Sequence, residues 1–157
     1  MIIKSTLPGW LQPPSVTQWS DACTPPFEIP WLGFMNNCIH PDTVLTVGRF
    51  LLPNFVEYEG GVFLEHKFSE KSFREWMREL NDMAQVENLL NHQHIYDLFI
   101  GAEDVSEESF YSAAVMLSQT LSLALGRCFP EREFQVTLSN SDLDYGPVVS
   151  FFSVAEN

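Results

Sequence analysis

The stretch Ser106–Pro130, SEESFYSAAVMLSQTLSLALGRCFP, decides the fold. Apolar side chains recur in it at steps of three and four residues, which is the spacing of one face of an α-helix. Ser106 is a preferred N-cap residue, and Pro130 cannot continue a helix. No charged residue occurs between Glu108 and Arg127. The pattern predicts a central helix that is largely covered, by a sheet on one side and by further chain or a partner on the other.

The segments around this helix predict a mixed fold. Apolar periodicity and capping residues indicate helices over Pro41–Leu52, Ser69–Leu80 and Met83–Leu90. Short apolar or alternating runs indicate a hairpin over residues 55–65 and strands over Ile95–Ile100, Phe134–Leu138 and Val148–Val154. Strands joined by short loops pair antiparallel. We therefore expect an α+β fold of two layers, with a largely antiparallel sheet of about five strands packed against the long central helix and several short helices.

The register of the hairpin depends on the length of its loop. Gly60 and Gly61 mark the turn. A two-residue loop would pair Glu59 with Val62 and so mix polar and apolar side chains on one face. A three-residue loop over residues 59–61 gathers the apolar side chains on one face, namely Val56, Tyr58, Val62 and Leu64. We expect the second register, because it buries one coherent face.

Residues 1–40 differ in composition from the rest of the chain. They hold six of the ten prolines and three of the four tryptophans. Proline enforces extended backbone, yet free linkers are usually poor in aromatic residues. We expect a single domain over residues 1–157, in which an extended aromatic and proline-rich segment, 1–40, packs on an α+β core, 41–157. Residues 15–22 are expected to form one or two helical turns.

The overall charge limits the classes of partner. The formal net charge is −13 at pH 7, and the isoelectric point is about 4.4. Nucleic acid and anionic membranes would repel such a chain. No apolar run is long enough to span a bilayer, and three widely spaced cysteines make no disulfide framework. We expect a cytoplasmic protein without nucleic-acid or membrane partners.

Acidic residues concentrate in the middle of the chain. Residues 55–110 hold 13 acidic and 4 basic residues. Several of the acidic residues crowd the entrance to the central helix or flank the hairpin turn, namely Glu103, Asp104, Glu107, Glu108, Glu57 and Glu59. Clustered charge speeds association with an oppositely charged partner. These six residues are our candidate binding surface for a basic protein partner.

One histidine pair suggests an alternative. His92 and His94 share a face if the backbone is extended there, and with Glu87 or Asp97 they would make a site of two histidines and one carboxylate. A metal-dependent enzyme is therefore the second hypothesis. Because no third ligand has a diagnostic spacing, we expect no metal and no other cofactor.

No motif identifies a family or a catalytic centre. Phosphate loops, nucleophile elbows and zinc-protease motifs are missing from the sequence. In size, in charge and in lacking such motifs the chain resembles bacterial immunity proteins, the small acidic cytosolic antidotes of toxins. This likeness carries no residue roles, because it rests on no shared motif. We expect an acidic binding module rather than an enzyme. A third hypothesis is a structural subunit or chaperone that docks through residues 1–40.

Overall fold

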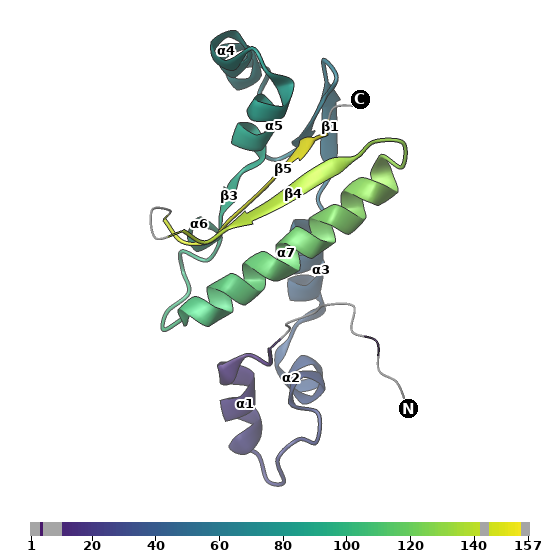
Figure 1. The fold of residues 1–157 in the computed structure, drawn as a ribbon. Coiled ribbons are helices and arrows are strands. Elements are labelled where there is room, and N and C mark those ends of the chain that lie inside the picture. Colours follow the sequence, from purple (N-terminus) through teal and green to yellow (C-terminus); the bar gives the residue numbers. More distant parts are fainter. Residues whose placement is uncertain (1–3, 5–10, 142–144, 155–157) are drawn as a thin grey trace. The chain divides into compact units, whose positions relative to one another are not determined.

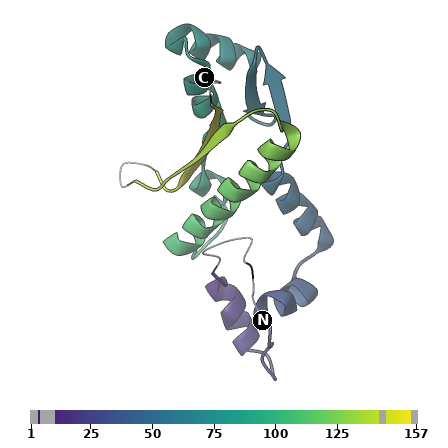
Figure 2. The ribbon, with the colours of Figure 1, turned by 45° about the vertical axis from the view of Figure 1, so that its right-hand side comes forward.

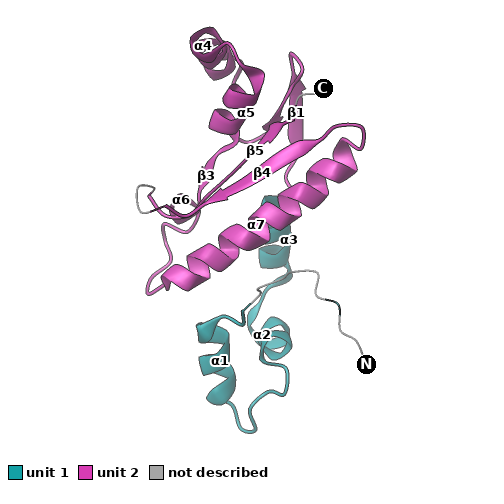
Figure 3. Ribbon diagram, in the orientation of Figure 1, with its two compact units in different colours: residues 1–50 teal, residues 51–157 magenta. Residues whose placement is uncertain are grey.

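The computed structural model describes Lys4, residues 11–141 and residues 145–154. Helices and small antiparallel sheets are mixed in it, which confirms the α+β class. The chain divides into two compact units, residues 1–50 and 51–157 (Figure 3). Each unit is described by itself below. The packing of residues 1–40 onto the rest as one domain stays a prediction.

Unit 1 contains a pair of helices where an extended segment was expected. The pair consists of α1 (Pro14–Asp21) and α2 (Pro30–Cys38). The ring of Trp19 stacks on Phe27 at 4.9 Å and meets the edge of Phe34 at 5.3 Å. Gly33 permits this packing, because a Cβ atom there would lie 2.4 Å from the Phe27 ring. Helix α1 confirms the helical turns predicted over residues 15–22, whereas α2 lies in a part of the segment that was expected to be extended.

The third helix, α3 (Pro41–Leu51), confirms the prediction for this segment to within one residue. None of its residues is buried. Several of its apolar side chains are exposed, namely Val44, Leu45 and Val47.

Unit 2 begins with a tight hairpin of β1 (Phe55–Tyr58) and β2 (Gly61–Leu64). Glu57 pairs with Val62 and Tyr58 with Gly61, so the loop has two residues and the expected three-residue register was wrong. Both loop residues, Glu59 and Gly60, have positive φ angles, 48° and 88°. Such a loop matches the natural twist of the strands. All four residues of β2 are buried, so both of its faces are covered. A register that gathers the apolar side chains on one face is therefore not favoured here.

The two helices predicted after the hairpin are present, and they pack on it. Helix α4 (Glu70–Leu80) is capped by Ser69, and α5 (Met83–Asn91) is capped by Asp82, whose carboxylate accepts from the Gln85 N–H at 3.0 Å. Their buried side chains meet β2 in one cluster, formed by Phe63, Phe73 and Val86. The cluster anchors α5 against the edge of the hairpin, which positions the polar residues of α5 described below.

The second sheet has three antiparallel strands in the order β3-β5-β4. They are β3 (Gln93–His94), β5 (Val148–Ser153) and β4 (Phe134–Ser139). The long helix α7 (Glu107–Cys128) runs beside β4 and β5 (Figures 1 and 2). Ser106 caps it through a hydrogen bond from the Ser109 N–H, as predicted. The side chains that α7 buries are Ala114, Leu117, Leu121, Ala124 and Leu125.

The segment predicted as a strand over Ile95–Ile100 forms instead the short helix α6 (Ile95–Leu98). Strand pairing ends where the Ile95 N–H donates to the Pro147 carbonyl at 2.9 Å. Tyr96 and Phe99 then both face Phe110 of α7, with ring centroids 4.6 and 6.4 Å away. Residues three apart share a helical face, so packing against α7 overrode the local preference for a strand.

The expected sheet of about five strands is interrupted. Strands β1–β2 and β3–β5–β4 make two separate sheets. Side chains of α5 occupy the junction: Asn91 donates to the carbonyls of Val62 in β2 and Phe151 in β5, at 2.9 and 3.3 Å. The single two-layer sheet was therefore wrong in detail, because α5 supplies the groups that a neighbouring strand would supply. None of the described helices has the length and apolar character to cross a membrane.

Candidate functional site

One acidic residue at the start of α7, Glu107, is hydrogen-bonded to α6. The Tyr96 hydroxyl donates a hydrogen bond to Glu107, and this bond raises the pKa of the Tyr96 phenol. Glu103 and Asp104 lie in the loop between α6 and α7, and both are exposed. Asp104 has a φ angle of 55°, a left-handed conformation that Asp tolerates better than most residues. The four acidic residues Glu103, Asp104, Glu107 and Glu108 thus lie together at one end of unit 2.

Exposed apolar side chains lie next to these acids. Leu98, Phe99 and Ile100 are consecutive and exposed, and Ile100 has 90% of its surface accessible. A hydrogen bond from the Ala102 N–H to the Phe99 carbonyl, at 2.9 Å, closes the turn that carries them. We call these three side chains and the four acids the acidic end. Sequence analysis placed the three apolar residues in a strand, so it missed their exposure.

The hairpin acids lie elsewhere. Glu57 is 3.8 Å from the guanidinium of Arg132, which follows the C-terminal end of α7 in the sequence. Glu59 occupies the hairpin turn. Helix α7 has 22 residues and is about 33 Å long at 1.5 Å per residue. Since the acidic end lies at its N-terminus, the six predicted residues form two groups at opposite ends of α7 rather than one patch.

Glu87 is a structural residue at the junction of the two sheets. It is fully buried. One carboxylate oxygen accepts from the Val62 N–H at 2.7 Å and the Ser153 hydroxyl at 2.8 Å, and the other accepts from the Ser153 N–H at 2.6 Å. Its oxygens are therefore engaged with β2 and β5, and the structure does not bring them to the histidines.

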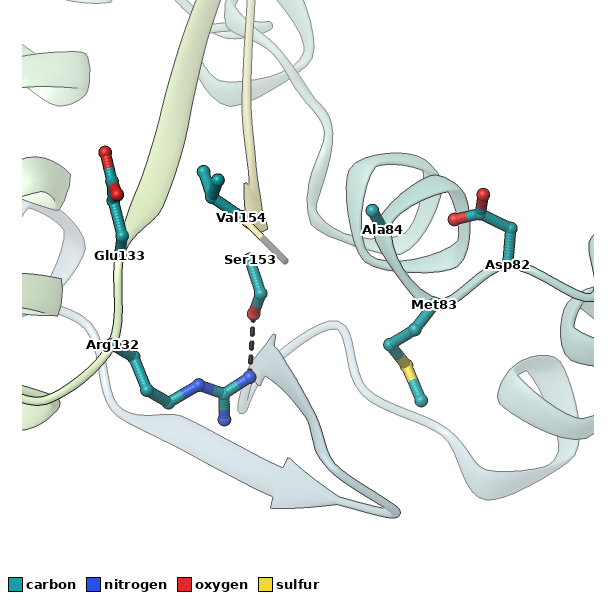
Figure 4. A pocket seen from close by; sticks show the side chains of 7 residues that line it. All are labelled: Asp82, Met83, Ala84, Arg132, Glu133, Ser153 and Val154. Carbon is teal, nitrogen blue, oxygen red and sulfur yellow. Dashed lines mark hydrogen bonds between the residues drawn. The ribbon is translucent and has the colours of Figure 1, made fainter. Parts of the chain in front are cut away.

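A pocket of about 560 Å³ opens beside this junction (Figure 4). Its one basic group is Arg132, which donates to the Ser153 hydroxyl at 2.7 Å and to the Gly60 carbonyl at 2.8 Å. Acidic side chains, Asp82 and Glu133, also line the pocket. The guanidinium also lies 3.8 Å from the Glu57 carboxylate and 4.0 Å from that of Glu87, so two carboxylates already balance its charge and this pocket offers little to an anionic ligand.

The predicted histidine pair lines a smaller cleft. The rings of His92 and His94 meet edge to face with centroids 5.2 Å apart. Each Nδ1 faces a backbone carbonyl, that of Leu89 for His92 and that of Tyr145, at 3.3 Å, for His94. Since a carbonyl only accepts, each Nδ1 donates in these contacts, which leaves Nε2 as the ring nitrogen that can meet another group. Asp97 lines the same cleft.

The structure brings only part of the proposed metal set together. His92, His94 and Asp97 line one cleft, while Glu87 belongs to the junction. Within the described part of the chain, no group of three or more His, Cys, Asp or Glu side chains is placed to hold a metal ion. Three further polar residues of the cleft, His66, Lys67 and Gln93, were missed, because only the fold brings them beside the predicted histidine pair.

The chain matches no protein-family model, no curated protein and no solved structure. Any functional assignment therefore depends on the geometry of its own surfaces.

Proposed function

We propose that this chain is an acidic protein-binding module that docks a basic partner protein through the acidic end. The observation that carries the proposal is the exposure of Leu98, Phe99 and Ile100 directly beside the acidic residues of the α7 entrance. Stable protein interfaces combine an apolar centre with a polar rim. The acidic end has both parts.

Each part has a distinct energetic role. An exposed aliphatic side chain such as Ile100 gains free energy when a partner removes it from water, about 25 cal/mol for each Å² buried. Exposed carboxylates such as Glu103 and Asp104 contribute mainly by steering, because charges at a rim raise the association rate more than the lifetime of the complex. The net charge of −13 extends the same attraction toward a cationic partner.

The test begins with capture of the partner on immobilised protein from the native cell, followed by rate measurements with the purified pair. Reversing Glu103 and Asp104 to lysine should slow association about tenfold at low salt, and the effect should shrink as salt screens the charges. Reversing Glu131 and Glu133, which follow the other end of α7, changes the net charge equally and serves as the matched control.

The apolar centre is tested separately. Ile100→Ser should speed dissociation about tenfold while leaving the association rate nearly unchanged, because a central apolar contact is lost. The equivalent control is Leu45→Ser, an exposed apolar residue of α3 in unit 1. If both charge reversals slow association equally and Ile100→Ser behaves as the control does, the acidic end is not the docking surface.

A further inference from the structure

Three of the four histidines of this chain line one small cleft. They are His66, His92 and His94, and the cleft also contains Lys67, Gln93, Asp97 and Leu98. The residues come from three places: the turn after β2, the junction of α5 with β3, and helix α6. The chain as a whole is strongly acidic, with 21 acidic and 8 basic residues, so a cleft lined by three histidines and a lysine differs from the rest of it.

Lys67 supplies the positive charge of the cleft. Its ammonium group donates to the His92 carbonyl. Partial burial lowers the pKa of Lys67, and the neighbouring Asp97 carboxylate opposes this effect. A carboxylate that entered the cleft would replace the water that burial has removed from the ammonium and would form a charge-assisted hydrogen bond with it.

Gln93 supplies an unused acceptor. It is only 4% exposed, and its Oε1 has no hydrogen-bond partner in the described part of the chain. Buried polar atoms of native proteins are nearly always paired, so an unpaired one indicates a missing partner. The partner of a carbonyl oxygen must be an N–H or O–H donor.

The remaining groups of the cleft add further polar atoms. His92 and His94 both donate from Nδ1 to backbone carbonyls, so Nε2 is the ring nitrogen that each leaves for a ligand. Asp97 adds a carboxylate. The lining thus combines one cationic donor with several acceptors, which suits a ligand that is anionic at one end and carries a donor close by.

We propose that this cleft binds a small carboxylic acid that bears a hydroxyl or amino group on the neighbouring carbon. The carboxylate would pair with Lys67, and the hydroxyl or ammonium would donate to Gln93 and the acceptors around it. The cleft volume of about 280 Å³ lies just below the range of sites for drug-sized ligands, so the ligand is small. This inference does not depend on the proposed docking function.

The probes are glycolate, glycine and acetate, which share a carboxylate and differ in the neighbouring donor. Titration of the full chain, followed by ¹H–¹⁵N NMR, should move the signals of residues 66–67 and 92–97. Glycolate or glycine should bind at least about tenfold more tightly than acetate, because acetate leaves the buried acceptor unpaired.

Two variants locate the contacts. Lys67→Met keeps the aliphatic stem and removes the charge, and it should weaken glycolate or glycine about tenfold or more. Gln93→Leu should abolish the preference over acetate. Lys71→Met is the matched control, since Lys71 is an exposed lysine on α4, 3.9 Å from Glu75, and it should bind the probes as wild type does.

Several results would overturn the inference. These are no signal change at millimolar probe, equal affinity for all three probes, or wild-type binding by a folded Lys67→Met variant. Signal dispersion of each variant reports its fold. If Lys67→Met is unfolded, Lys67→Gln replaces it, because it also removes the charge but keeps a donor for the His92 carbonyl, and the same loss is expected. Stoichiometric zinc, iron or manganese in untagged protein, lost when His92 and His94 are replaced, would assign the cleft to a metal instead.

Discussion

Carboxylate side chains occur both at the junction between the two sheets and at the acidic end of α7, but in opposite environments. At the junction, Glu87 is fully buried, and its oxygens accept from Val62 and Ser153. At the acidic end, Glu103 and Asp104 are exposed beside apolar side chains that water also reaches. An acidic residue whose acceptors are filled by the fold contributes to stability, whereas one left in solvent is free to meet a partner. The residue type alone does not predict which of these two environments an acidic residue will have.

The largest loss of stability is expected for Glu87→Ala at the junction. It leaves buried donors on Val62 and Ser153 without an acceptor, each costing about 1–3 kcal/mol, so unfolding should become easier by about 3–5 kcal/mol. Urea titration measures the loss. Glu75→Ala, at an exposed position of α4, should change stability by less than about 0.5 kcal/mol. Equal small losses would show that the junction does not depend on Glu87.

A second substitution compares the junction with an apolar contact. Leu117→Ala should cost about 2–5 kcal/mol, because Leu117 is fully buried on α7 and its truncation leaves a cavity. Leu123→Ala is the matched control on the same helix, since Leu123 is 71% exposed. Urea titration should separate the two variants clearly. A large loss at Leu123 would mean that this side of α7 is also packed.

The smallest effect is expected at the acidic end. Reversing both Glu103 and Asp104 to lysine should lower the free energy of unfolding by no more than about 1–2 kcal/mol, because both side chains are exposed and the main cost is the left-handed backbone of residue 104, which lysine tolerates less well than aspartate. Thermal and urea unfolding provide the measurement, and Glu87→Ala is the reference for a residue that the fold requires. A loss of stability as large as that of Glu87→Ala would contradict the contrast between the two regions.

The helices and their ends were largely predictable from the sequence, whereas the candidate sites were not. Ser69 and Ser106 were identified as N-caps, and each caps its helix. The histidine pair was noticed, but Lys67 and Gln93 were not, since nothing in their local sequence indicates a shared cleft. The acids at the α7 entrance were found, yet the apolar residues beside them were assigned to a strand that packing against Phe110 turned into a helix.

Local features such as helix caps depend only on neighbouring residues and could be predicted from the sequence. The hydrogen bond that caps α7 joins residues three positions apart, Ser106 and Ser109, so the pattern that encodes it is contiguous. Only the tertiary structure decided how the strands divide into two sheets. Glu87 reaches Ser153 across 66 positions, and Asn91 reaches Phe151 across 60. Such contacts form because buried backbone groups need hydrogen-bond partners from the segment that packs beside them. The spacing of residues along the chain does not predict which segment that is.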